Sequence, residues 1–238
     1  MTSFKKRLAL DAALAVLTLV LMPYGLLPPL LHELSGVALF ALVLLHIYVN
    51  RRWFKTLFSG IYTPIRAYRI ALVVALASAF LAQFLSGVVI SGELLTFLPE
   101  LSVSSSARDL HLPIGAWILL LVGLHAGDHW LMLTRKLNGR PTLRALVIMT
   151  STALLLQGGY EFYRQGISDY LTANVPFANF DYDAPLALVI ERYFALFFAY
   201  FVVGALVSTF LRACSHDLNA AINQNPTQTE TTIPEDRE

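Results

Sequence analysis

The sequence is poor in charged residues, which make up 14% of its 238 positions, whereas 56% are hydrophobic. A soluble domain of this size could not bury the long apolar runs that result, so the composition predicts an integral membrane protein. The chain also lacks a Gly-x-Gly-x-x-Gly motif, so we expect no nicotinamide- or flavin-binding domain in it. Its single cysteine, Cys214, excludes an internal disulfide.

The apolar runs are continuous, whereas the strands of a membrane barrel would be about ten residues long and alternate in polarity. The predicted fold class is therefore all-α, a bundle of about six transmembrane helices. The expected spans are Leu8–Met22, Leu31–Val49, Ile70–Ile90, Leu110–Leu133, Leu143–Gln157 and Leu186–Leu211. The first span has a basic start, as a signal peptide does, but no small-residue cleavage site follows it, so we expect it to be retained.

Basic residues are concentrated in alternate connecting segments, which predicts the orientation of the helices. One set of segments holds Lys5, Lys6, Arg7, Arg51, Arg52, Lys55, Arg66, Arg69, Arg135, Lys136, Arg140 and Arg144. The other set holds only Arg108 and Arg164. We therefore expect both termini to be cytoplasmic, in a bacterial cytoplasmic membrane, with the second, fourth and sixth helices running from outside to inside.

Two of the expected spans carry the same pattern of histidine and glycine. HELSGVALFALVLLH (residues 32–46) and HLPIGAWILLLVGLH (residues 111–125) both read histidine, three residues, glycine, nine residues, histidine. Two positions 14 residues apart in a helix fall about 40° short of four full turns and rise about 21 Å, so both histidines share a face. Because the two helices run in the same direction, His32 is level with His111 near the outside, and His46 with His125 near the inside.

Two stacked pairs of imidazoles favour two haems, each an apolar disc with one histidine on either face of its iron. Gly36 and Gly115 would let the ring approach the backbone. Because the sequence has no Cys-x-x-Cys-His motif, the haems would be non-covalent and b-type. The alternatives are histidines that only hydrogen-bond neighbouring helices, and a metal ion without a porphyrin, although zinc normally draws four ligands to one point.

Haem propionates need cationic or hydrogen-bonding partners. Arg108 and Arg192 are placed for the outer haem, and Arg51, Arg52 and Arg135 for the inner one. Each arginine has an alternative role at the membrane interface, where it would orient the protein. His129 lies one turn beyond His125 and is the alternative inner ligand, but the repeat aligns it with Asn50 and so favours His125.

These residues resemble the flavinylation-associated cytochromes, a family akin to the ferric-reductase-like transmembrane and bacterial cytochrome b groups. The resemblance covers residues 8–134 and is carried by His32, Gly36, His46, Asn50-Arg-Arg-Trp53, His111, Gly115, His125 and His129-Trp130. It implies a four-helix di-haem core in residues 1–134. Two additional helices with a long outer loop (158–185) would follow in residues 135–212, and a disordered cytoplasmic tail in residues 213–238.

The first hypothesis for function is an electron-transfer subunit that moves single electrons across the membrane. Because no donor or acceptor domain is present, the donor, a quinol or a cytosolic reductant, and the acceptor must be separate molecules. The resemblance implies an outer-face redox partner such as a flavoprotein, and we expect no nucleic-acid partner. The alternatives are a quinol-linked oxidoreductase acting on a small species at the outer haem, and a scaffold or transporter with proton-relay histidines.

Overall fold

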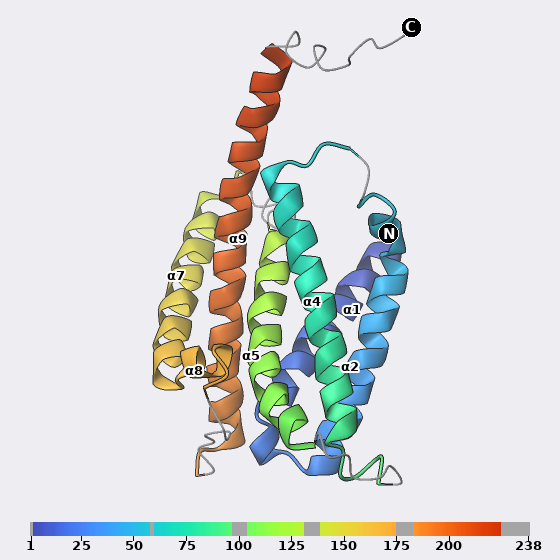
Figure 1. Cartoon of the computed structure of the whole chain (residues 1–238). Helices are drawn as coiled ribbons and strands as arrows, with labels where there is room; N and C mark the ends of the chain where they lie inside the picture. Colours follow the sequence, from blue (N-terminus) through green and yellow to red (C-terminus); the bar gives the residue numbers. More distant parts are fainter. Residues whose placement is uncertain (1, 58–59, 97–103, 131–138, 175–182, 225–238) are drawn as a thin grey trace, which may run out of the picture.

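The structure is a computed structural model that describes residues 2–57, 60–96, 104–130, 139–174 and 183–224 (Figure 1). Over these residues it is helical, with no strand, so the predicted all-α class is confirmed. The elements are α1 (Thr2–Leu21), a 3-10 turn η1 (Tyr24–Leu26), α2 (Pro29–Val49), α3 (Arg51–Phe54), α4 (Pro64–Val89), α5 (Ser104–Asp128), α7 (Pro141–Arg164), α8 (Ile167–Leu171) and α9 (Leu186–Gln224).

Proline sets the first residue of three long helices. Pro29, Pro64 and Pro141 begin α2, α4 and α7. Proline suits this position because its fixed φ matches a helix and its missing N–H would have no partner there. As a result α4 begins six residues before the expected start at Ile70, and its first turns carry Arg66 and Arg69. The apolar run alone had indicated only the later part of this helix.

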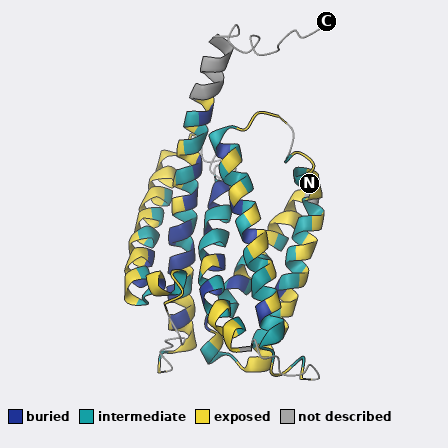
Figure 2. Cartoon of the chain, in the orientation of Figure 1, coloured by how far each residue is buried: buried dark blue, intermediate teal, exposed yellow. Residues whose placement is uncertain are grey.

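Four helices are long and apolar enough to cross a membrane among the residues described: Pro29–Val49, Pro64–Val89, Ser105–Asp128 and Leu186–His216. Many of their large apolar side chains are exposed, including Leu45 on α2, Leu81 on α4 and Leu206 on α9. Figure 2 shows such exposed residues along the outer faces of the bundle. Surfaces of this kind are suited to a lipid environment, so the chain has the character of a membrane protein.

The helices form two groups that meet at α5 and α9 (Figure 1). On one side α4 packs on α5, and α1 packs on α2; on the other, α9 packs against both α5 and α7. Successive long helices run in opposite directions, so both chain termini lie at one end of the bundle, called here the termini end. The core lies between α5 and α9 and includes Leu119, Leu196, Phe197 and Tyr200.

Glycines allow α5 and α9 to approach closely. A Cβ atom on Gly123 of α5 would lie 2.6 Å from Cβ of Tyr200, and one on Gly204 of α9 would lie 2.7 Å from Cα of Leu124. Gly127, one turn after Gly123, faces the backbone of Phe201 in the same way. Small residues four apart are typical of closely packed membrane helices, because the backbones themselves form the contact.

Helix α2 is packed much more loosely than α5. Leu39 is its only buried residue. Its backbone packs mainly on α1, less on α4, and scarcely approaches α5. Contact between α2 and α5 is therefore made by side chains and not by close approach of the two backbones.

The structure also corrects the expected outer loop and the expected tail. Within the expected loop 158–185, α7 continues through Arg164 and α8 adds a further turn, while residues 175–182 lie outside the described part. The tail expected to be disordered from residue 213 is instead helical through Gln224, and residues 225–238 lie outside the described part. Extending an existing helix needs no new nucleation, so polar residues can prolong it well beyond its apolar run.

Candidate functional site

The four repeated histidines form two pairs between α2 and α5. The ring centres of His32 and His111 lie 6.3 Å apart, with 67° between the ring planes. Those of His46 and His125 lie 6.5 Å apart, at 77°. We call these pairs the first level and the second level; the second lies towards the termini end, about 21 Å along the helices from the first.

At the first level, residues of α4 fix the orientation of the His111 ring. The hydroxyl of Ser86 donates to the carbonyl oxygen of Gln83 at 3.0 Å, so its oxygen is available to accept from Nδ1–H of His111 at 2.9 Å. This arrangement places the ring proton on Nδ1 and the lone pair on Nε2. Nε2 then accepts a hydrogen bond from the side-chain amide of Gln83 at 3.0 Å.

The space beside the His111 ring is narrow on the α4 side. A Cβ atom on Gly87 would lie 3.3 Å from Cε1 of His111, so a larger residue there would push on the imidazole. On the partner helix, the His32 ring makes an edge contact with Tyr24 at 5.3 Å. Nδ1 of His32 is buried and has no hydrogen-bond partner in the part of the chain that the structure describes.

At the second level, a carboxylate from a third helix meets the His46 ring. Oδ1 of Asp11 on α1 lies 2.9 Å from Nδ1 of His46, which is a hydrogen-bonding distance, although the ring N–H does not point at this oxygen. His125 also makes an edge contact with His129, whose ring centre is 5.3 Å away.

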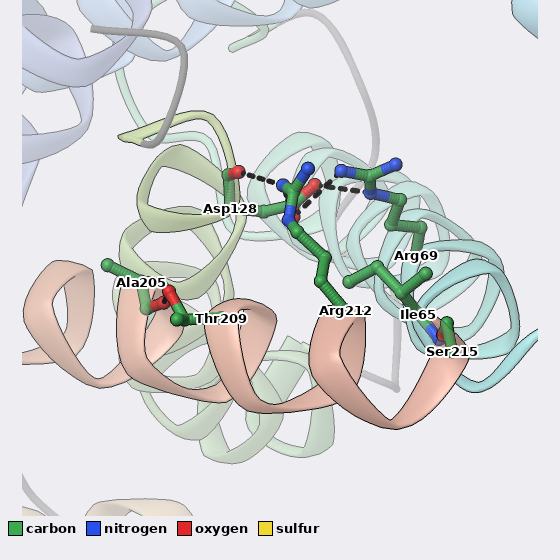
Figure 3. A network of polar contacts seen from close by, with 7 residues as sticks. All are labelled: Ile65, Arg69, Asp128, Ala205, Thr209, Arg212 and Ser215. Carbon is green, nitrogen blue, oxygen red and sulfur yellow. Dashed lines mark hydrogen bonds and ion pairs between the residues drawn. The ribbon is translucent and has the colours of Figure 1, made fainter. Parts of the chain in front are cut away.

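A cluster of charged residues joins three helices at the termini end (Figure 3). Arg69 of α4 donates to the Asp128 carboxylate from Nε at 2.7 Å and from Nη2 at 3.1 Å. Arg212 of α9 donates to Oδ1 of Asp128 at 2.9 Å and to its backbone oxygen at 2.8 Å. The Asp128 side chain is only 4% exposed, so these contacts satisfy a nearly buried charge.

The same end of the bundle has a further link between α4 and α9. The backbone N–H of Ile65 donates to the hydroxyl oxygen of Ser215 at 3.2 Å, and that hydroxyl donates to Leu211. Figure 3 shows this link beside the Asp128 cluster. Because the oxygens of Asp128 are bound by two arginines, this carboxylate holds the helices together and is not available to orient an imidazole.

The arginines expected to meet haem propionates lie in different settings. Arg51, at the start of α3, donates to the backbone oxygen of Tyr48 at 3.0 Å and covers the ring of that residue. Both contacts are therefore with the last turn of α2. Arg52 is exposed, as is Arg108 in the first turns of α5, one turn before His111. Arg192 is buried on α9. Arg135 lies outside the described residues.

The two glycines of the repeat also differ from each other. A Cβ atom on Gly36 would meet nothing within 4 Å, so the backbone of α2 is open there, as close approach of a ring requires. A Cβ atom on Gly115 would lie 3.6 Å from Nε2 of Gln83. Gly115 therefore faces the amide that contacts His111.

The spacing of the imidazoles can be compared with the requirement of a shared metal. A metal–imidazole bond of about 2 Å, with the ring centre about 1 Å behind the ligating nitrogen, separates the centres of two opposed imidazoles by about 6 Å. The observed 6.3 and 6.5 Å agree with this value. The buried, unpartnered Nδ1 of His32 and the open backbone at Gly36 also fit a group held between the rings, provided that Gln83 withdraws from Nε2 of His111.

A metal site of the zinc type has less support. Such a site draws four ligands to one point. Among the described residues no group of three or more His, Cys, Asp or Glu side chains is placed to hold one ion. The donor sets on α2 and α5 are paired imidazoles, which is the set that a haem uses.

Comparison with known proteins adds no identification: no family model, curated protein or solved structure matches the chain. Asp11 and Ser86 were missed by the sequence analysis, although Asp11 had a signal, since it is the one charged residue in the apolar run 8–22. An isolated carboxylate within a span usually has a functional partner.

Proposed function

We propose that the protein is a transmembrane di-haem b-type cytochrome that transfers electrons across a membrane, similar to the flavinylation-associated cytochromes. The observation that supports this most is the pair of imidazole contacts between α2 and α5, at 6.3 and 6.5 Å and at two depths. Four imidazoles within membrane helices are costly unless they bind something. A shared pattern in two parallel helices gives each imidazole a partner.

In this proposal His32 and His111 hold the outer haem, and His46 and His125 the inner one. The haems supply reversible one-electron chemistry, and the protein positions them and adjusts their potentials. Ser86 holds the His111 ring by Nδ1, and Nε2 would bind the iron once the Gln83 amide withdraws from it. Gly36 keeps the surface of α2 free of a side chain. His129 lies beside His125 but does not bind the iron of the inner haem.

The proposed membrane topology has six spans, with α1 and α7 added to the four helices that qualify by length and composition. α1 has 20 residues and α7 has 24, which correspond to about 30 and 36 Å of helix. A hydrocarbon core is about 30 Å thick, so both are long enough to cross it. The termini end, which carries most loop arginines and lysines, would face the cytoplasm of a bacterial cell.

The donor in this proposal is a quinol or a cytosolic reductant, and the acceptor is an outer-face redox protein such as a flavoprotein. An inside-negative membrane potential favours outward movement of an electron by about 2.3 kcal/mol per 100 mV. The protein needs both partners because it contributes only the path between them.

The proposal is tested by reconstituting the purified protein in sealed vesicles with a reductant inside and ferricyanide outside. We expect ferricyanide to be reduced at a rate that depends on the amount of protein. Vesicles containing the His46→Ala/His125→Ala variant are the control, because that variant lacks both ligands of the second level and should be inactive. Equal rates in wild-type, variant and protein-free vesicles would contradict transmembrane electron transfer.

A further inference from the structure

The two histidine levels differ in the charge of their nearest neighbours. At the second level the Asp11 carboxylate lies 2.9 Å from Nδ1 of His46. Asp11 is the only charged residue between Leu8 and Met22. In the described part of the chain no lysine or arginine forms an ion pair with Asp11, whose side chain is 51% exposed and whose charged-pair contact is with His46.

At the first level the contacts to the ligand nitrogens are neutral. His111 is bound by the hydroxyl of Ser86 and the amide of Gln83. Glu33 follows His32 in sequence, but its two carboxylate oxygens accept from the Ser91 hydroxyl and from the backbone N–H groups of residues 92, 93 and 94. These four donors hold the Glu33 carboxylate on the segment that follows α4, and among the described contacts it acts on His32 only through its charge, without a hydrogen bond to the imidazole.

The other charged residues near the second level lie in one cluster. Asp128 is bound by Arg69 and Arg212, and this cluster carries a net positive charge. His129 is a further titratable side chain near the pair, with its ring centre 5.3 Å from that of His125. Among the described residues, the carboxylate within hydrogen-bonding distance of a proposed ligand is therefore Asp11, at the second level.

We propose that Asp11 is a positioning residue that accepts the Nδ1–H of His46 and gives the second-level haem the lower reduction potential of the two. This inference rests on the proposed function. A carboxylate acceptor fixes the tautomer with Nε2 towards the iron and makes the imidazole a stronger electron donor. Stronger donation stabilises ferric over ferrous iron, which lowers the reduction potential of that haem relative to one whose ligands have only neutral partners.

The test is a spectroelectrochemical titration of the purified, haem-containing protein. We expect the wild type to titrate in two one-electron components. Asp11→Asn keeps the size of the side chain and removes its charge, so it should raise the lower potential and leave the higher one in place. A tenfold change in the reduction equilibrium, about 59 mV for one electron, is the expected scale. Asp109→Asn, an exposed carboxylate near His111, is the matched control and should move neither component.

The possible results separate a failure of the role of Asp11 from a failure of the proposed function. A variant that retains two haems with both potentials unchanged overturns the role of Asp11, as does an equal shift of both components. If Asp11→Asn does not fold, His46→Ala decides the question, because it should remove the lower-potential component; loss of the higher one overturns the inference. A wild-type protein that binds no haem overturns the proposed function itself, and so is distinguishable from a failure of this inference alone.

Discussion

Ser86 on α4 and His111 on α5 are joined by a 2.9 Å contact between the serine oxygen and Nδ1 of the imidazole. The serine hydroxyl is already used by the Gln83 carbonyl, so the contact has one direction, from ring N–H to oxygen. A helix that carries no histidine of its own thereby sets the tautomer of a histidine on its neighbour.

The first prediction concerns this contact. Ser86→Ala should weaken haem binding at the first level about 10- to 100-fold, because a partner that orients a ligand contributes on this scale. The measurement is a haem titration of the apoprotein followed in the Soret region. Ser105→Ala, at an exposed position in the first turn of α5, should bind both haems normally. Unchanged affinity in Ser86→Ala would show that the tautomer is fixed in another way.

The second prediction concerns the ligand assignment. His46→Ala and His111→Ala should each retain one haem of two, because they remove ligands from different levels. His129→Ala should retain both, since the repeat and the 6.5 Å spacing pair His46 with His125. Haem per chain, measured as the pyridine haemochrome, separates these cases. Loss of one haem from His129→Ala but none from His125→Ala would reverse the assignment.

The third prediction concerns the charge cluster at the termini end. Asp128→Asn should lower the free energy of unfolding by about 2–3 kcal/mol, because two arginines lose a nearly buried partner. The effect should be smaller than for a fully buried pair, since both guanidinium groups are about one third exposed. Thermal or denaturant unfolding in detergent measures it. Arg52→Ala, at an exposed position, should change stability by less than about 0.5 kcal/mol.

The fourth prediction compares two glycines. Gly127→Ala should destabilise the α5–α9 interface by about 1–3 kcal/mol, because the added methyl group would overlap the backbone of Phe201. Gly159→Ala on the exposed side of α7 meets nothing within 4 Å and should stabilise the helix by about 0.5–1 kcal/mol. Unfolding in the same detergent gives both values, and opposite signs are expected. Equal effects would mean that close packing at Gly127 is unimportant.

Much of the fold could be predicted because apolar runs determine where membrane helices form. Each of the six expected runs lies largely within a long helix, and four of these helices qualify as spans. The boundaries were less accurate: α1, α4 and α5 begin six residues before the expected spans, and α7 and α9 end well after them, because polar residues prolong each helix beyond its apolar part. Hydropathy does not register such extensions, whereas a proline such as Pro64 marks the true first turn.

The candidate site could be predicted only where its pattern lies within single helices. The spacing of His32 and His46 places both on one face of α2, and the matching spacing in α5 indicates which rings share a depth. Contacts with other helices depend on packing, which the repeat does not encode. The positions of Asp11 beside His46 and of Ser86 beside His111 therefore became evident only in the folded chain.

The central claim is that the protein holds two haems between α2 and α5. Its most direct test is the visible spectrum of the purified, folded protein, together with its haem content by pyridine haemochrome. The account predicts sharp reduced α-bands of b-type haem and two haems per chain, one for each histidine level. A folded protein that remains colourless when expressed with an adequate haem supply would contradict it.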